Sequence, residues 1–212
     1  MARALSLCGV ILAAGDSSRM GTDKALLRWP PPRQGQAGAG TFLSAAIESL
    51  DPFTEMVIVV GGKNAPALSP IVYASGASLA INHNPERGQF SSLQVGLQEV
   101  LNRGRDAAMV TLVDRPPVSP LTIETLVDGF AAATRRWKWA VVPQIEGRHG
   151  HPIILGREMI EAFLKAPPTS VARDIEHQNQ MHIEYVTVED PTVAANINTP
   201  EDYAALALGV LR

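Results

Sequence analysis

The chain has 212 residues and a formal net charge of −3, and 46% of its residues are hydrophobic. This length predicts one α/β domain over residues 1–212, and a weakly acidic chain without long basic runs is not expected to have nucleic acid as its main partner. No apolar run is long enough to cross a bilayer, so we expect a soluble, cytoplasmic protein with no membrane partner.

The first apolar run, over residues 5–12, predicts a β-strand that leads into a glycine-containing loop. A secretory signal peptide is the competing interpretation. It is disfavoured because the run is short and is interrupted by Ser6 and Gly9. The single cysteine, Cys8, gives no disulfide framework, and we interpret it as a buried thiol on the first strand.

Strand-like and helical patterns alternate along the rest of the chain. Helices are predicted over residues 42–50, 91–101, from Ser119 or Thr122 to about 133, 158–164, and from Pro200 onward. Strands are predicted over residues 56–60, 78–81, 107–113, 139–142, 152–155 and 182–188, with a loop between 60 and 78. Residues 30–40, rich in Pro, Gly, Gln and Ala, predict a mobile surface loop. The alternation indicates an α/β fold with a mostly parallel sheet.

The loop after the first strand has the composition of a triphosphate-binding site. Its sequence, over residues 12–24, is LAAGDSSRMGTDK. Small residues let the backbone approach a ligand, a turn of glycine and serine can direct N–H groups at phosphate oxygens, and cations supply positive charge. The small residues are Ala13, Ala14 and Gly15. The turn consists of Gly15, Ser17 and Ser18, and the cations are Arg19 and Lys24. The spacing differs from those of a P-loop and of G-x-G-x-x-G.

Asp114 follows the apolar run over residues 107–113, at the carboxyl end of a predicted buried strand. Open α/β sheets bind their ligands at this edge. A carboxylate that faces a triphosphate is unfavourable unless a divalent metal lies between them, and Mg²⁺ typically takes one or two carboxylates. The alternative is that Asp114 only forms the turn before Pro116 and Pro117.

Several segments resemble one known family. Residues 12–24 resemble LAAGxSxRMGxxK, the signature of the MobA-like nucleotidyltransferases. Residues 113–118, VDRPPV, resemble the family's DQPxV motif, whose Asp holds magnesium; Arg115 stands where Gln or Met is usual and could help bind an anionic phosphate. Residues 82–93, NHNPERGQFSSL, and 196–202, NINTPED, resemble two further family segments.

This resemblance implies a Rossmann-like three-layer α/β/α nucleotidyltransferase fold and Mg²⁺-dependent nucleotidyl transfer with release of pyrophosphate. It gives catalytic roles to Arg19, Lys24 and Asp114, and metal contacts to Asp114 and Asn196, with Asn198 as the less favoured donor. It implies that the nucleotide is bound by Leu12, Ala13, Ala14, Gly15, Ser17, Ser18, Arg19, Lys24, Gly61 and Ser92. Helix capping is the alternative role for the serines at 91 and 92 and for residues 199–202.

Residues 147–152, GRHGHP, resemble the RGHP segment of the cytidylyltransferase branch, which implies that Arg148 and His151 contact the acceptor substrate. Zinc is not expected at this pair of histidines, because no third ligand of suitable spacing follows. The family's later GDxGAR segment is degraded here to TSVARD, over residues 169–174.

Ala14 and residues 150–152 favour CTP as the nucleotide and molybdopterin as the acceptor, as in the MocA-like molybdenum cofactor cytidylyltransferases, with a molybdoenzyme as the recipient. Residues 196–198 favour a guanylyltransferase for the same cofactor, and sugar- or alditol-phosphate nucleotidyltransferases also share the loop. An alternative of another class is a non-catalytic accessory protein that binds the cofactor for a molybdoenzyme, which Arg115, His149 and the degraded segment support.

Overall fold

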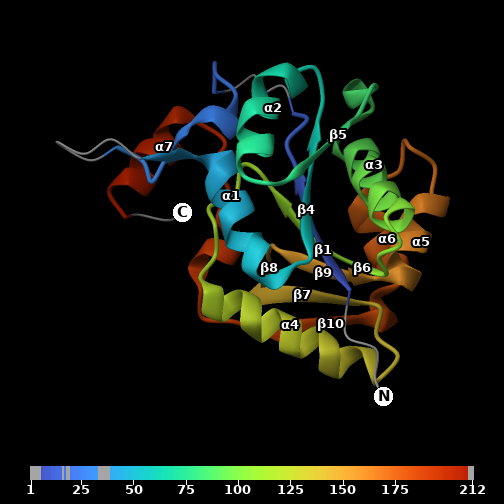
Figure 1. Cartoon of the computed structure of the whole chain (residues 1–212). Helices are drawn as coiled ribbons and strands as arrows, with labels where there is room; N and C mark the ends of the chain where they lie inside the picture. Colours follow the sequence, from blue (N-terminus) through green and yellow to red (C-terminus); the bar gives the residue numbers. More distant parts are fainter. Residues whose placement is uncertain (1–5, 16, 18–19, 33–38, 210–212) are drawn as a thin grey trace.

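The computed structural model describes residues 6–15, 17, 20–32 and 39–209. Its centre is a sheet with the strand order β10-β7-β9-β6-β1-β4-β5 (Figure 1). The strands are β1 (Leu7–Leu12), β4 (Met56–Gly61), β5 (Ser78–Ile81), β6 (Ala107–Leu112), β7 (Ala140–Ile145), β9 (Ile153–Gly156) and β10 (Ile183–Thr187). A short strand, β8 (Arg148–His149), pairs with β7, while β2 (Arg28–Trp29) and β3 (Gly40–Thr41) pair with each other apart from this sheet.

Most neighbouring strands run parallel. β1 pairs in parallel with β4 and β6, β4 with β5, and β7 with β10. β9 runs antiparallel to both β6 and β7. The carboxyl ends of β1, β4, β6 and β7 therefore share one edge of the sheet, and β9 begins at that edge. This geometry brings the segment between β8 and β9 to the same edge as the loops after β1 and β6.

Helices cover both faces of the sheet (Figure 1). One layer contains α1 (Phe42–Leu50), α2 (Ala65–Ala74) and α4 (Pro120–Thr134); the other contains α3 (Gln89–Asn102), α5 (Arg157–Lys165) and α6 (Ala172–Gln178). β1 supplies both cores, because alternate side chains point to opposite faces: Leu7 and Ile11 enter one core, Cys8 and Val10 the other. The predicted fold class is confirmed.

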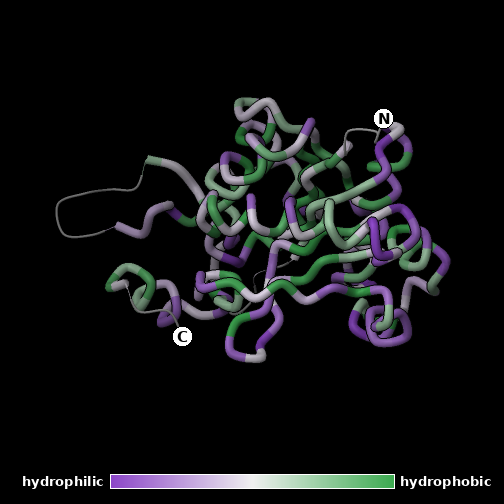
Figure 2. Tube along the Cα trace, turned by 90° about the horizontal axis from the view of Figure 1, so that it is seen from below, coloured by the Kyte–Doolittle hydropathy of each residue, from purple (hydrophilic) through white to green (hydrophobic). Residues whose placement is uncertain are grey.

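Hydrophobic segments pass through the middle of the molecule, and hydrophilic segments lie mainly in peripheral turns (Figure 2). The cysteine predicted to be buried, Cys8, is 0% exposed. Among the described residues, no helix has both the length and the apolar character needed to cross a membrane. The stretch over residues 30–40 connects β2 and β3, and its residues 33–38 lie outside the described part of the chain.

The prediction of a loop between residues 60 and 78 is wrong, because this segment contains α2. Its two prolines make this helix hard to recognise in the sequence, because proline is uncommon inside helices. Pro66 lies in the first turn, where a missing N–H removes no helical hydrogen bond, and Pro70 lies farther inside the helix. Leu68 and Val72 are both 0% exposed, so burial of this face compensates for the interior proline.

Helix starts are defined by local capping. The side chain of Ser119 accepts a hydrogen bond from the backbone N–H of Thr122, so α4 begins after Ser119. α7 (Pro200–Ala207) begins with a capping box between Thr199 and Asp202, as the alternative role for this segment predicts. Gly88 is the N-cap of α3, which rules out either predicted serine as its cap.

Gly96 permits α3 to pack closely on the sheet. A Cβ added there would lie 2.7 Å from Val10 Cγ1 and 3.0 Å from Val60 Cγ2. We expect Gly96→Ala to lower the free energy of unfolding by about 1–2 kcal/mol, because overpacking outweighs the better helix propensity of alanine. Urea titration measures this change. Gly15→Ala is the matched control, since no described atom lies within 4 Å of the added Cβ; equal stability of the two variants would contradict the prediction.

Candidate active site

The loop after β1 is held by its own polar atoms and by the neighbouring strand. The N–H of Ala13 donates to the carbonyl of Val60 at 2.9 Å. Ser17 has a φ of +47°, and its side-chain oxygen accepts from the N–H of Lys24 at 3.1 Å. The serine predicted to form the phosphate turn therefore fixes the backbone at the predicted catalytic lysine. Two other predicted binding residues, Ser18 and Arg19, lie outside the described residues.

Asn64 joins this loop to the loop after β4, a role that the sequence analysis missed. Its Nδ2 donates to the carbonyl of Ala13 at 2.8 Å and to Asp23 Oδ2 at 2.6 Å, and its Oδ1 accepts from the N–H of Gly62 at 3.0 Å. Asp23 in turn accepts from the N–H of Ala25, so the contact reaches both neighbours of Lys24. An asparagine two residues after the paired glycines Gly61 and Gly62 at a strand end was the available signal.

The predicted Gly61 is not a lining residue of the cavity beside the phosphate loop. A Cβ there would lie 3.3 Å from Ala65 Cβ, so Gly61 packs against the start of α2. Gly62 instead contacts the phosphate loop, since an added Cβ would lie 3.0 Å from the carbonyl oxygen of Ala14. The close approach of the two loops therefore depends on Gly62.

Lys24 lies at the junction of three segments that are distant in sequence. Its Nζ donates to Asp114 Oδ2 at 3.0 Å and to Asn198 Oδ1 at 3.1 Å. Lys24 is only 8% exposed, so these two oxygens replace much of its hydration. The structure thus brings together the predicted catalytic residues Lys24 and Asp114. It also adds Asn198, which was the less favoured of the two asparagines expected to contact the metal.

The oxygen atoms near this cluster fit the expected magnesium ion. Asp114 Oδ1 and Asn196 Oδ1 are both buried and have no hydrogen-bond partner among the described residues. The N–H of Ile197 donates to the carbonyl of Asp114 at 2.9 Å, which ties the two segments together. Carboxylate and amide oxygens are ligands that Mg²⁺ accepts. No group of three His, Cys, Asp or Glu suited to a metal occurs in the described part of the chain, as expected for a site that relies on few carboxylates.

A cavity of about 240 Å³, here called the nucleotide cavity, lies beside the phosphate loop. The predicted residues among those that line it are Leu12, Ala14, Gly15, Ser92 and Asp114. They come from β1, its following loop, α3 and the end of β6. The structure therefore brings five predicted site residues to one concave surface at the carboxyl edge of the sheet.

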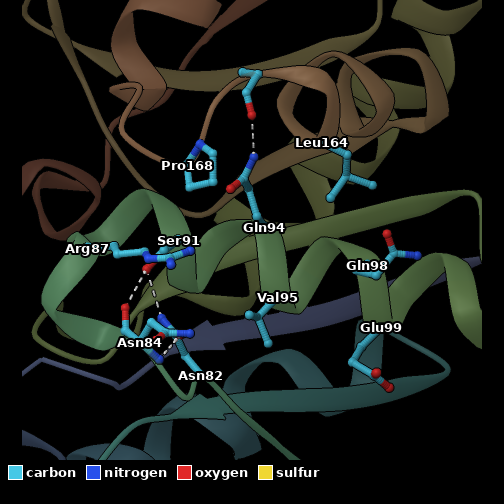
Figure 3. A pocket seen from close by; sticks show the side chains of 11 residues that line it. Asn82, Asn84, Arg87, Ser91, Gln94, Val95, Gln98, Glu99, Leu164 and Pro168 are labelled. Carbon is cyan, nitrogen blue, oxygen red and sulfur yellow. Dashed lines mark hydrogen bonds between the residues drawn. The ribbon is translucent and has the colours of Figure 1, made fainter.

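Asn82 orients the two serines of α3. Its Nδ2 donates to Ser91 Oγ at 2.9 Å and to Ser92 Oγ at 3.0 Å, and its Oδ1 accepts from the N–H of Asn84. Figure 3 shows Asn82, Asn84 and Ser91 close together at one end of a groove, with Gln94 pointing toward the segment after α5. The groove has a volume of about 440 Å³. Because Ser92 also lines the nucleotide cavity, this network fixes one wall of that cavity.

A larger cavity of about 900 Å³, here called the acceptor cavity, shares four lining residues with the nucleotide cavity. The shared residues are Leu12, Gly88, Gln89 and Leu112. Both predicted acceptor-binding residues, Arg148 and His151, line the acceptor cavity. The two cavities are therefore contiguous, an arrangement that suits two substrates that react with each other.

The segment before Asn196 is positioned by Arg115, which follows β6, and by His151, which precedes β9. Arg115 Nη1 donates to the carbonyls of Val193 at 3.1 Å and Ala195 at 3.3 Å. The backbone N–H of His151 donates to the same Val193 carbonyl at 2.9 Å. Arg115 thus uses Nη1 on backbone carbonyls, while its Nε has no hydrogen-bond partner among the described residues. Its suggested part in binding an anionic phosphate stays a prediction.

His151 is expected to stay neutral over the physiological pH range. Burial, together with the nearby Arg115, lowers the pKa of His151 from 6.5 to about 3. Its Nδ1 has no hydrogen-bond partner among the described residues. A neutral imidazole can donate through one nitrogen and accept through the other, so it suits hydrogen bonding to an acceptor substrate rather than charge neutralisation.

We therefore expect the His151 imidazole to show no protonation above about pH 5 in an NMR titration, with its signal assigned by comparison with His151→Gln. Because the folded-state pKa is the lower one, this group's contribution to stability is complete above pH 6.5 and is lost as the pH falls toward 3. A midpoint above pH 6 would contradict this assignment.

Comparisons with known proteins give a consistent picture. The model of the MobA-like NTP transferase domain family matches residues 9–182. A probable molybdenum cofactor guanylyltransferase of Mycobacterium avium (strain 104) is 31% identical, with 98% of each chain covered. The molybdenum cofactor cytidylyltransferase of Escherichia coli (strain K12) is 26% identical, with 92% of each chain covered.

Solved structures share the whole fold. The crystal structure of Rv0371c from Mycobacterium tuberculosis H37Rv has a TM-score of 0.79 at 26% identity, with 97% of this chain and 99% of that chain covered. The structure of Rv0371c in complex with manganese has a TM-score of 0.75 at 22% identity, with 97% and 100% covered. The resemblance thus extends over nearly the whole of each chain.

Proposed function

The chain belongs to the MobA-like NTP transferase family, and we propose that it is a molybdenum cofactor nucleotidyltransferase. It would transfer a nucleoside monophosphate from a nucleoside triphosphate to the phosphate of molybdopterin and release pyrophosphate. The observation that carries this proposal is the cluster of Lys24, Asp114 and Asn198: its Asp114 lines the nucleotide cavity, and that cavity shares part of its lining with the acceptor cavity.

The residues present suit attack by a phosphate nucleophile. An acceptor phosphate is already ionised at neutral pH, so its attack on the α-phosphorus requires no general base. The developing negative charge must be stabilised instead, and Lys24 provides a preorganised cation for this purpose. Arg19 is proposed as a second cation, on the strength of the sequence motif. Backbone N–H groups near Gly15 would bind the phosphates.

Asp114 and Asn196 are proposed to hold a divalent ion, with Mg²⁺ as the expected species. Their unpartnered buried oxygens support this assignment, and the manganese complex of Rv0371c supports a divalent ion in a protein of the same fold. When bound, the ion would neutralise the triphosphate beside Asp114 and stabilise the pyrophosphate leaving group. Lys24 already offsets the Asp114 charge in the structure, so nucleotide and metal would compete with this ion pair.

CTP is the proposed nucleotide, because Ala14 lines the nucleotide cavity and its methyl group takes space that a glycine would leave open for a larger purine. GTP is the second candidate, since the relative at 31% identity is named as a probable guanylyltransferase. Ala14 packs toward Gly62, where an added Cβ would lie 3.3 Å from Ala14 Cβ, so the loop after β4 holds this methyl group in place.

Pyrophosphate release measures both the reaction and the base preference. We expect release from CTP in preference to GTP, ATP and UTP, and only when molybdopterin and Mg²⁺ are both present. Ala14→Gly should move the preference toward GTP because the cavity widens. A preference for GTP in the wild type would transfer the assignment to the guanylyl branch. Nucleotide binding without pyrophosphate release would favour the non-catalytic accessory protein.

Variants of the charged cluster test the site assignment. We expect Lys24→Ala to lower kcat by about 10²-fold or more through lost charge stabilisation, and Asp114→Ala to abolish turnover. Lys165→Ala is the matched control, because it removes an exposed lysine of α5 that pairs with Glu161. Thermal melting checks that each variant is folded. Full activity in a folded Lys24→Ala or Asp114→Ala protein would overturn the assignment.

A further inference from the structure

The acceptor cavity has an apolar surface that can accommodate a flat ring. Phe90 and Leu93 of α3, together with Val110 of β6 and Ile153 of β9, contribute to its lining. Its volume of about 900 Å³ is in the usual range for small-molecule sites. One part of the lining is shared with the nucleotide cavity, and a different part is formed by residues 169–173 and Glu176.

One part of the lining lies near the central strand of the sheet, and the other lies near an edge strand. The shared lining includes Leu12, which belongs to the central strand β1. His149, which also lines the cavity, stacks on Tyr185 of the edge strand β10 with ring centroids 4.3 Å apart. Burial raises the pKa of Tyr185, and the charge of the nearby Glu176 adds to this effect. Because β7, β9 and β6 separate β10 from β1, a ligand that spans the cavity would present opposite ends to Leu12 and to Glu176.

Glu176 is the carboxylate among the residues that line this cavity, whose other charged members are Arg87, Arg148 and Arg173. Its side chain makes no hydrogen bond or ion pair within the described part of the chain. Burial raises the pKa of Glu176, and Arg173 partly opposes this effect. Glu176 is half-buried, and its oxygens are not among the buried unpartnered atoms of the described residues. A ligand that displaces water from this carboxylate must therefore supply N–H groups in its place.

The chemistry of a carboxylate narrows the choice of ligand group. An ionised carboxylate accepts hydrogen bonds through both oxygens, and two adjacent N–H donors on a planar group satisfy them in parallel. The 2-amino group and the N3–H of a pterin form such a pair. The arginines that line the same cavity suit the anionic groups at the other end of such an acceptor.

We propose that Glu176 determines acceptor specificity by accepting hydrogen bonds from the 2-amino group and the N3–H of a pterin ring. The ring lies against the apolar lining, and the acceptor phosphate points toward the nucleotide cavity. This inference rests on the proposed function, which supplies a pterin as the acceptor. It adds the residue that recognises the ring at the end remote from the reacting phosphate.

A pair of ring systems that differ at one group provides the test. Pterin carries an amino group at position 2, whereas lumazine carries an oxo group there. Binding of each to the full-length protein is followed by fluorescence, without any transfer reaction. We expect the wild type to bind pterin at least about 10-fold more tightly than lumazine, because lumazine would place an oxygen against the carboxylate.

Glu176→Gln changes the hydrogen-bonding pattern with little change in shape. A glutamine presents one acceptor and one donor, which match the N3–H and the 2-oxo group of lumazine. We expect this variant to lose the preference for pterin and to favour lumazine. Glu176→Asp is a second variant, which withdraws the carboxylate and should weaken pterin binding without improving lumazine binding. Glu124→Gln, an exposed position on α4 in the opposite layer, is the matched control.

The outcomes separate this inference from the proposed function. A folded Glu176→Gln protein that keeps the wild-type preference, or a wild type that does not discriminate between the two rings, overturns the inference. Pyrophosphate release from a nucleoside triphosphate and molybdopterin tests the proposed function independently. Discrimination without pyrophosphate release would overturn the proposed reaction and leave the role of Glu176 supported.

Discussion

The ion pair between Lys24 and Asp114 is the interaction on which the site depends. It joins the end of the phosphate loop to the end of β6, and Asn198 adds the segment before α7. Withdrawal of an ammonium group from water is unfavourable unless its hydrogen bonds are replaced. The three segments must therefore come together for any of them to be stable in this position, and their convergence creates the edge on which both cavities open.

Backbone contacts extend this constraint to the acceptor side. The carbonyl of Val193 accepts from both Arg115 and His151, and the chain then continues directly to the unpartnered Asn196. A Cβ on Gly150 would lie 2.2 Å from that carbonyl oxygen, so only glycine permits this packing. Because β9 runs antiparallel to its neighbours, the segment before it, with Gly150 and His151, lies at the edge of the sheet where the two cavities are found. The lining of the acceptor cavity and the oxygens proposed to hold the metal thus depend on the same backbone contacts.

The two cavities differ in the ligand groups that they suit: one suits charged groups, and the other suits an apolar ring. Near the shared lining, Lys24, Asp114 and the glycine loop suit phosphate groups and a divalent ion. Farther along the acceptor cavity, apolar side chains and Glu176 suit a flat ring with adjacent donors. A transfer between two phosphates requires both substrates to be held in line, and contiguous cavities achieve this without a large rearrangement.

The sequence by itself determined the alternation of strands and helices, the phosphate loop, Asp114 at a strand end, and the occurrence of Arg148 and His151 in one short segment, because each depends on local periodicity or a short motif. It did not reveal α2, whose prolines mask a helix that burial of Leu68 and Val72 stabilises. Asn64, Asn198 and the backbone role of Arg115 were decided by tertiary structure, as was the position of Glu176. Asn64, Asn198 and Arg115 each bond to residues many positions away in the sequence, and the cavity lining around Glu176 comes from several elements, so only the folded sheet brings these groups together.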